Sequence, residues 1–379
     1  MQPIEVSVII PCLNEESTIA TCIKKAQQAL IENSVSGEII VVDNGSIDRS
    51  SAIALNCGAQ VILQPVKGYG AAYRKGFENA TGKYIVMGDG DDTYDFSRLY
   101  DLVKLLKEGN DLAVGSRFLG TIFPGAMSFS HRYIGNPFLT GILNLFFHAH
   151  VSDAHSGFRA ITKQALTKLN LLTTGMEFAS EMIVAALREK LKIAEIPIEY
   201  GTRSGTSKLN TFPDAWRHIR FMLLFSPNWL FLVPGSLLFG GGLLAFFITS
   251  IGQLSLLGHT FDIHAMLFFT AFILLGFQIL STWVFAKAFS VREGLIHGSR
   301  LLDRFSGIVS LERTLMIGSI FFLMGFGGSI YIFIEWAKVN FVGYFIMLKQ
   351  SLYCLLLMVI GLQTVFSAFF ISLLRTSKN

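Results

Sequence analysis

The pattern of apolar and polar residues divides the chain near residue 228. In the first part, short β-branched apolar runs alternate with polar loops and with segments of helical periodicity. We expect strands at 6–10, 38–42, 61–63, 83–86 and 112–114, and helices at about 17–32, 47–57, 69–80, 96–108 and 179–190. Such alternation predicts an α/β domain with a mainly parallel sheet that is covered on both faces.

In the second part, four apolar runs are each long enough to cross a bilayer, which takes about 20 helical residues. They cover about 229–250, 264–289, 315–336 and 350–374. Buried helices of a soluble protein are the alternative, but four such runs would be hard to keep in solution.

We therefore expect three regions. Residues 1–210 form the α/β domain, and 229–379 form an all-α membrane domain of four transmembrane helices. Between them, 211–228 combine a basic turn with Trp and Phe, and Pro213 suits a first helical turn. This composition predicts an amphipathic helix in the membrane interface.

Charge indicates the orientation in the membrane. The net charge is +4, and it belongs to the apolar part, because residues 1–228 hold as many acids as bases. A neutral soluble domain argues against nucleic-acid binding. The segment 287–313 is rich in Lys and Arg, whereas 251–263 has neither. The positive-inside rule then predicts that 287–313, the α/β domain and both termini are cytoplasmic.

Two further sequence features narrow the class of protein. No signal sequence opens the chain, because the first five residues lead directly into a predicted strand. The four cysteines show no C-x-x-C spacing, which argues against a disulfide framework or a zinc site in a cytoplasmic domain.

Three acidic loops follow predicted strands, at 11–16, 43–48 and 88–95. In an open α/β sheet, ligands bind beyond the carboxyl ends of the strands. Asp48 and Asp95 are best explained as helix caps. Asp89 and Asp91 form an Asp-x-Asp pair, whose hard oxygen ligands suit Mg²⁺ or Mn²⁺ bound together with substrate phosphates.

Other known site types fit less well. An EF-hand calcium loop needs an acidic or amide residue and then Gly where this chain has Thr93 and Tyr94. A dinucleotide site needs G-x-G-x-x-G after the first strand, where the chain has P-C-L-N-E-E, and the run that starts at Lys67 is only a weak match. Neither G-x-S-x-G nor H-E-x-x-H occurs.

Basic residues also recur among small ones. The clusters contain Arg117, His131–Arg132, Ser156 with Arg159, and Arg203 with Lys208. Arginine binds phosphate bidentately, and glycine lets a backbone approach a ligand closely. Each cluster alone could be a surface ion pair, but together with Asp-x-Asp they favour phosphorylated substrates.

In series, these motifs resemble family 2 glycosyltransferases, and within them the polyprenyl-phosphate glycosyltransferases of the dolichol-phosphate mannose or glucose synthase type. The resemblance covers about residues 5–225. It rests on V-S-V-I-I-P-x-x-N-E-E (6–16), V-V-D-N-G-S-x-D (41–48), Asp89-x-Asp91, G-S-R (115–117), D-x-x-S-G-F-R (153–159) and R-x-G-x-S-K (203–208).

The resemblance implies a GT-A fold, a nucleotide sugar donor (a UDP- or GDP-hexose) and a divalent cation. It assigns the nucleotide sugar to Pro11, Asn14, Glu15, Asp43, Lys67, Asp89, Gly90 and Asp91, and the metal to Asp89 and Asp91. The phosphate of a polyprenyl phosphate acceptor falls to Arg117, Arg132, Ser156, Arg159, Arg203 and Lys208, with 203–208 as a mobile loop. Asp89, Asp91 and Arg117 are then the expected catalytic residues.

Three departures from the family pattern stand out. Asn44 replaces a second Asp of many relatives, Asp92-Thr93 replaces a more usual Leu-Gln, and four predicted spans exceed the two of many relatives. The third metal ligand and homo-oligomerisation stay open.

Two other functions are alternatives to this one. A processive polysaccharide synthase would carry Q-x-x-R-W ahead of its channel helices, and the chain has no such run. A lipid-linked sugar transporter or flippase would bury polar residues in its spans, which hold few.

Overall fold

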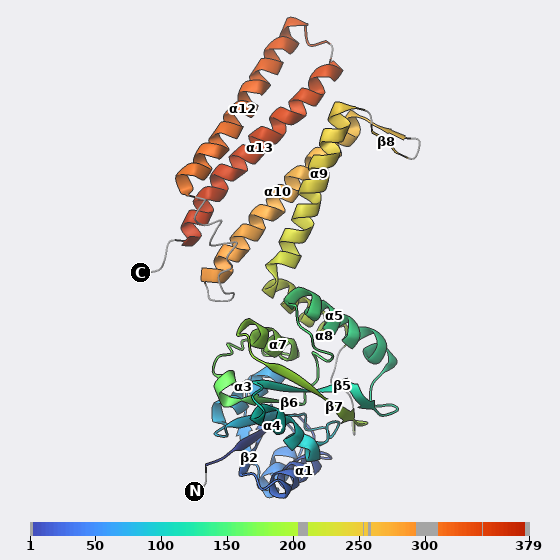
Figure 1. The fold of residues 1–379 in the computed structure, drawn as a ribbon, viewed down its shortest axis with the longest axis vertical. Helices are drawn as coiled ribbons and strands as arrows, with labels where there is room; N and C mark the ends of the chain where they lie inside the picture. The colour runs from blue at the N-terminus through green and yellow to red at the C-terminus, as the bar shows by residue number, and fades with distance from the viewer. Residues whose placement is uncertain are drawn as a thin grey trace. The chain divides into compact units, whose positions relative to one another are not determined.

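The computed structural model describes residues 3–203, 211–252, 254–256, 259–292, 310–342 and 344–375. The chain forms two compact units, Met1–Met222 and Leu223–Asn379 (Figure 1).

Unit 1 is built on a seven-stranded sheet with the order β3-β2-β1-β4-β6-β5-β7. The strands are β1 (Val6–Cys12), β2 (Gly37–Asp43), β3 (Gln60–Leu63), β4 (Tyr84–Met87), β5 (Leu112–Ile122), β6 (Arg159–Thr162) and β7 (Ile193–Tyr200). Only β6 runs antiparallel to its neighbours β4 and β5. The predicted mainly parallel α/β sheet is therefore confirmed, with β6 and β7 as strands that the sequence pattern did not identify.

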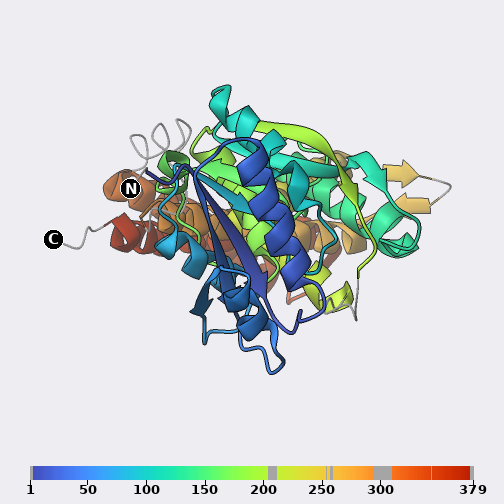
Figure 2. The same ribbon diagram turned by 90° about the horizontal axis from the view of Figure 1, so that it is seen from below.

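The helices of unit 1 cover both faces of this sheet. They are α1 (Ile19–Glu32), α2 (Ser50–Asn56), α3 (Tyr69–Asn79), α4 (Leu99–Lys107), α5 (Asn136–Phe147), α6 (Lys163–Leu166), α7 (Phe178–Arg188) and α8 (Thr211–Phe225), with short turns at Phe96–Arg98 and His131–Gly135. Figure 1 shows α1 on one side of the sheet and α7 on the other, and Figure 2 looks onto the side of α1. Of these helices, α5 and the short α6 were not expected from the sequence.

Alternation along β1 explains both layers. Val8 and Ile10 belong to one apolar cluster with residues of α1 and α4. Ile9 points to the opposite face, where a Cβ on Gly76 of α3 would lie only 2.4 Å from Ile9 Cγ2. Because neighbouring side chains of a strand point to opposite faces, the apolar run Val8–Ile10 of one strand stabilises two layers of helices.

Unit 2 consists of long apolar helices. They are α9 (Val233–Ile251) preceded by a helical turn at Asn228–Leu232, α10 (Ile263–Arg292), α12 (Leu311–Lys338) and α13 (Tyr344–Arg375). A short hairpin of β8 (Leu254–Leu256) and β9 (His259–Phe261) joins α9 to α10. Among the described residues, four helical segments are long and apolar enough to cross a membrane: Asn228–Ile251, Ile263–Arg292, Leu311–Lys338 and Met347–Leu374. The four predicted spans are thus confirmed as apolar helices.

Small residues let these helices approach closely. A Cβ on Gly276 would lie 2.4 Å from the backbone nitrogen of Phe239, and one on Gly361 would lie 2.4 Å from that of Phe322. Glycine at such contacts is typical of helix packing in membranes.

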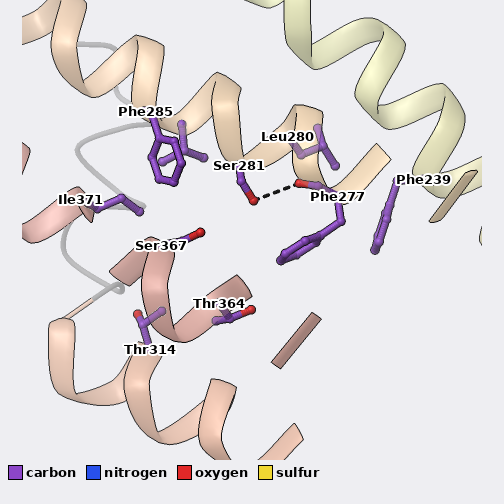
Figure 3. Close-up of a pocket in the computed structure, with 10 residues that line it drawn as sticks. Phe239, Phe277, Leu280, Ser281, Phe285, Thr314, Thr364, Ser367 and Ile371 are labelled. Carbon is purple, nitrogen blue, oxygen red and sulfur yellow. Dashed lines mark hydrogen bonds between the residues drawn. The ribbon is translucent and has the colours of Figure 1, made fainter. Parts of the chain in front are cut away.

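A groove of about 330 Å³ lies within unit 2 (Figure 3). Its lining residues are Phe239, Phe277, Leu280, Ser281, Val284, Phe285, Thr314, Thr364, Ser367 and Ile371. Ser281, Thr314 and Thr364 donate their hydroxyl hydrogens to carbonyl groups of their own helices. The groove therefore presents a largely apolar surface and no charged group.

Candidate functional site

The three acidic loops meet at one edge of the sheet. They follow β1, β2 and β4, which are adjacent and parallel in the order β2-β1-β4. Asn14 N donates to Ser46 Oγ at 3.0 Å, and Thr18 Oγ1 donates to the Gly90 carbonyl at 2.7 Å. The fold therefore brings together segments that lie more than 70 residues apart in the sequence.

The loop of Glu15 is held by the start of α2. Glu15 N donates to Ser50 Oγ at 2.8 Å, and Asn14 Oδ1 accepts a hydrogen bond from Ile47 N at 2.8 Å. Asp48 accepts from Ser50 N at 3.0 Å, but it stands one residue before the expected cap position, because the N-cap of α2 is Arg49. Pro11 lies in β1 itself, opposite Val42.

Asp43 ends β2 with its carboxylate turned into its own loop. It accepts hydrogen bonds from the backbone nitrogens of Gly45 and Ser46 and from the Ser51 hydroxyl. Burial raises the pKa of Asp43, but these hydrogen bonds outweigh it and hold the pKa below its ordinary value. A fixed negative charge therefore stands at this end of the sheet.

The structure explains why residue 44 is Asn rather than Asp. Its amide nitrogen donates to the carbonyls of Gln64 and Val66, and its oxygen accepts from Gly68 N at 2.7 Å. An aspartate could not donate these bonds. Asn44 thus fixes the 64–68 loop, which carries the exposed Lys67, against the end of β2.

Asp89 is partly buried beside aromatic side chains. Its Oδ1 accepts hydrogen bonds from Tyr69 at 3.0 Å and from Tyr73 at 3.4 Å. A Cβ on Gly157 would lie 2.8 Å from Asp89 Oδ2, so only glycine lets the 153–159 loop come this close. Burial and the neighbouring Asp91 raise the pKa of Asp89 to about 7, although Tyr69 and Arg117 act in the opposite direction.

Asp91 faces a cationic side chain from far along the sequence. Its Oδ1 accepts from Thr93 Oγ1 at 2.6 Å, and its Oδ2 lies 3.4 Å from Arg203 Nη1. Arg203 Nη2 also pairs with Glu15 Oε1 at 2.9 Å. Arg203 therefore bridges the first and third acidic loops, while Thr93 is committed to orienting Asp91.

The other two aspartates of this loop point elsewhere. Asp92 has a positive φ of 59° and pairs with Lys25 of α1 at 2.8 Å. Asp95 accepts a hydrogen bond from Ser97 N at 3.1 Å and caps the turn that leads into α4, as predicted. The four acids therefore have three different roles, and Asp92 is held away from Asp91.

This arrangement makes a first prediction. Replacing Asp92 by Asn should leave transfer activity within about twofold and lower the free energy of unfolding by no more than about 1 kcal/mol, because a partly exposed ion pair contributes little. Asn also tolerates a positive φ. Steady-state activity and thermal unfolding of the purified chain measure both effects. A large loss of activity would place Asp92 in the site after all.

The two-aspartate arrangement fits a shared metal ion rather than a fully enclosed one. Within the described residues, no group of three or more His, Cys, Asp or Glu is placed to hold a metal. Mg²⁺ typically takes one or two protein carboxylates together with substrate phosphates. Burial and, after it, repulsion from Asp91 raise the pKa of Asp89, and a divalent cation would relieve this repulsion.

Arg117 forms a buried ion pair that the sequence did not reveal. Its Nε and Nη2 donate to both oxygens of Asp153, at 2.7 and 2.8 Å, and its backbone nitrogen donates to Asp153 Oδ2 at 3.1 Å. The guanidinium also lies over the ring of Tyr200 at 5.2 Å. Burial raises the pKa of Asp153, but Arg117 outweighs it and keeps that pKa low. Asp153 thus fixes the position of Arg117.

The surroundings of Arg159 differ from those expected of a ligand to the acceptor phosphate. It is 1% exposed, and it donates to the carbonyl groups of Ser156, Ala179 and Ala154 at 2.8 Å each. These bonds shape the 153–159 loop and leave it facing backbone rather than a ligand. Ser156 is also fully buried in this loop, where its hydroxyl accepts from Phe158 N at 3.4 Å. The sequence could not tell a phosphate ligand from a loop-shaping arginine.

Two of the expected residues remain. Arg132 stands over the ring of Tyr133 at 5.4 Å. Lys208, and with it most of the expected 203–208 loop, falls outside the described residues.

A histidine pair next to the 153–159 loop went unrecognised in the sequence. The rings of His155 and His218 are 4.5 Å apart, and Ser180 hydrogen-bonds both, at 3.2 Å to His155 Nε2 and 2.8 Å to His218 Nδ1. Burial lowers the pKa of both residues, that of His218 to about 4. Two neutral imidazoles therefore connect α8 to the loop that holds Asp153.

Comparison with known proteins agrees with this geometry. Residues 7–169 match the family model of glycosyl transferase family 2, and 284–375 match the C-terminal transmembrane region of the same family. The low-salt glycan biosynthesis hexosyltransferase Agl6 of Haloferax volcanii is 41% identical over 366 residues, which cover 96% of this chain and 87% of that protein. The chain belongs to glycosyltransferase family 2.

This family 2 glycosyltransferase has other relatives that match a smaller share of the chain. Glycosyltransferase AglJ of Haloferax volcanii is 30% identical over 224 residues, covering 59% of this chain and 72% of that protein. Glucosyl-3-phosphoglycerate synthase from Mycobacterium tuberculosis, solved with Mn²⁺, UDP and glucosyl-3-phosphoglycerate, matches with a TM-score of 0.49 and 23% identity over 58% of this chain and 78% of that one.

The family match and the sheet order together confirm the GT-A fold of the catalytic unit. The chain is an enzyme, and the apolar helices and the match to the transmembrane region make it a membrane protein.

Proposed function

We propose that the chain transfers a hexose from a nucleotide sugar to the phosphate of a polyprenyl phosphate, with inversion, at the cytoplasmic face of the membrane. The observation that carries the proposal is the convergence of Glu15, Asp43, Asp89 and Asp91 at one sheet edge of a catalytic unit joined to four apolar helices. The hexosyltransferase Agl6 supports a hexose as the transferred group.

The donor would occupy the edge formed by the loops after β1, β2 and β4. Asn14, Glu15 and Asp43, with Pro11 and Lys67 nearby, are the residues we assign to the nucleotide, and Asp89, Gly90 and Asp91 to its diphosphate end. Asp91 and Asp89 would hold Mg²⁺ or Mn²⁺, which supplies positive charge to the departing diphosphate when bound. Arg203, already between Glu15 and Asp91, adds a cation at the same place.

The acceptor chemistry needs little proton transfer. A phosphate monoester carries a negative charge near pH 7, so one of its oxygens can attack the anomeric carbon as the bond from that carbon to the diphosphate oxygen breaks. The nucleoside diphosphate leaves with the electron pair, and the anomeric centre inverts. Catalysis then consists mainly of positioning and charge stabilisation, with Arg117 as the residue we assign to the acceptor phosphate.

The distribution of Lys and Arg along unit 2 bears on which side of the membrane the catalytic unit lies. Lys287, Arg292 and Arg313 lie at the ends of α10 and α12 that flank 293–310, whereas the segment between α9 and α10 has no Lys or Arg. This asymmetry supports a cytoplasmic catalytic unit.

Purified protein, polyprenyl phosphate and a labelled nucleotide sugar should yield a labelled, organic-extractable lipid. UDP-glucose, UDP-N-acetylglucosamine and GDP-mannose, tested in parallel, identify the donor. A chelator should abolish the product, and added Mn²⁺ or Mg²⁺ should restore it. Transfer of sugar to a growing polysaccharide, with no lipid product from any donor, would contradict the proposal and favour a polysaccharide synthase.

A further inference from the structure

Helix α5 carries apolar residues on two opposite faces. Leu139, Thr140 and Leu143 are buried, on the side where α5 packs against α7. Ile134, Phe138 and Leu145 are exposed by 62%, 59% and 53%. Ile134 lies in the turn His131–Gly135 that leads directly into α5. Together with the exposed Gly141 the three residues recur every three to four positions and form one line along this turn and the helix, here called the α5 stripe. Helix α5 has already buried one face, so folding of unit 1 does not explain the second.

The surroundings of the α5 stripe have the composition of a bilayer interface. No Asp, Glu, Lys or Arg occurs between Arg132 and Asp153. At the start of this segment Arg132 lies over Tyr133, and the exposed Phe129 packs on the same ring with centroids 4.9 Å apart. Aromatic rings and arginine gather where hydrocarbon meets the polar head groups. A surface in contact with water alone would be expected to carry charged residues.

The α5 stripe is linked through the polypeptide to the segment before the first candidate span. Helix α8 is tied to the 153–159 loop through His218, His155 and Ser180, and α5 is tied to the same loop because Thr140 Oγ1 accepts a hydrogen bond from Ala154 N at 3.4 Å. Helix α8 ends at Phe225, and the first candidate span begins at Asn228. Helix α5 is therefore connected, through one loop and α8, to the segment that leads into the first candidate span.

We propose that the α5 stripe lies in the head-group region of the bilayer and holds the 153–159 loop, with Asp153 and its partner Arg117, at the membrane surface. The stripe contacts lipid rather than another protein, because an uncharged apolar helix face bordered by arginine and aromatic rings is suited to a lipid surface. The consequence for catalysis rests on the proposed function: a loop held there would meet the phosphate of a membrane-embedded acceptor.

Lipid contact can be measured without any catalysis. In the full chain with Cys57→Ser, the other three cysteines are buried, so a single added cysteine can carry a fluorophore. The test site is Phe138→Cys, and the matched control is Ile31→Cys on α1, an exposed apolar residue outside the stripe. Both proteins are reconstituted into vesicles of phosphatidylcholine and phosphatidylglycerol, with or without brominated acyl chains.

The label at position 138 should be quenched by brominated lipid and protected from aqueous iodide, while the label at position 31 should show the reverse. Equal accessibility of both labels to iodide would overturn the proposal. Protection at 138 without quenching by brominated lipid would also overturn it, because another protein surface, such as a second copy of the chain, would then cover the stripe.

An activity comparison separates this proposal from the proposed function. Phe138→Ser with Leu145→Ser should lower transfer to long-chain polyprenyl phosphate in vesicles about tenfold or more and leave transfer to a short-chain, water-soluble analogue unchanged. An equal loss with both acceptors would show a merely structural role for the stripe. If the unmodified enzyme uses neither acceptor while position 138 still contacts lipid, the proposed function fails and the membrane-facing stripe stands.

Discussion

Replacing Asp91 by Asn is expected to lower kcat/KM for sugar transfer about a thousandfold. Asn keeps the size of the side chain and the acceptor for Thr93 Oγ1, but it removes the negative charge that faces Arg203 and that we assign to the metal. Loss of one preorganised electrostatic contact at a reacting centre commonly costs 10²–10³ in rate, and weaker metal binding adds to this.

Two measurements separate a lost metal ligand from a misfolded site. In the presence of the nucleoside diphosphate, Asp91→Asn should bind Mn²⁺ more weakly, as measured from the electron paramagnetic resonance signal of the unbound ion. The thermal unfolding temperature of the metal-free protein should change little. Asp92→Asn is the matched control, because it removes an equal charge one residue away that is paired with Lys25 instead. Full activity of Asp91→Asn would refute the assignment of this carboxylate to the metal.

The strands that the sequence predicted are those with a simple apolar pattern. Val6–Cys12 and Gly37–Asp43 lie in the centre of the sheet with helices on both faces, so nearly every position is apolar. The last strand, Ile193–Tyr200, alternates instead and contains Pro197. It lies at the edge of the sheet, where a missing backbone donor is tolerated. Because of this proline, the sequence pattern did not predict the strand.

Helix α5 was missed for a different reason. Its apolar residues face both the unit interior and the outside, so the periodic contrast that marks an amphipathic surface helix is weak. The structure shows which apolar residues of α5 are buried in unit 1. The apolar residues that remain exposed indicate a second apolar environment.

The candidate site was predictable as a set of loops but not as a set of contacts. Strand order alone brings the three acidic loops to one edge, because parallel strands end together. Which oxygen faces which cation depends on residues far away in the sequence: Arg203 for Asp91, Lys25 for Asp92 and Asp153 for Arg117. An isolated motif does not specify such partners, and for Arg159 the partners turned out to be backbone carbonyls.

The ion pair of Arg117 and Asp153 leads to the second large effect. Asp153 is fully buried and Arg117 is 6% exposed, so replacing Asp153 by Ala leaves an uncompensated cation in the interior. We expect the free energy of unfolding of unit 1 to fall by ~3–5 kcal/mol, which lowers its unfolding temperature by about 10 °C, together with loss of transfer activity as Arg117 moves. Thermal unfolding of the purified full chain, followed by near-ultraviolet circular dichroism, measures the shift.

The pH and the control variants make this prediction specific. Because the pKa of Asp153 is held low, its stabilising contribution is complete at pH 7 and is lost only as the pH falls through that low pKa, so the comparison belongs at neutral pH. Asp101→Ala removes an acid from an exposed pair with Arg98 at 2.7 Å and should change stability by less than about 1 kcal/mol. Adding Arg117→Met to Asp153→Ala should restore much of the stability but not the activity, since it removes the stranded charge and the proposed phosphate ligand together. If Asp153→Ala unfolds at the same temperature as the unmodified chain, the charge of Arg117 does not depend on Asp153.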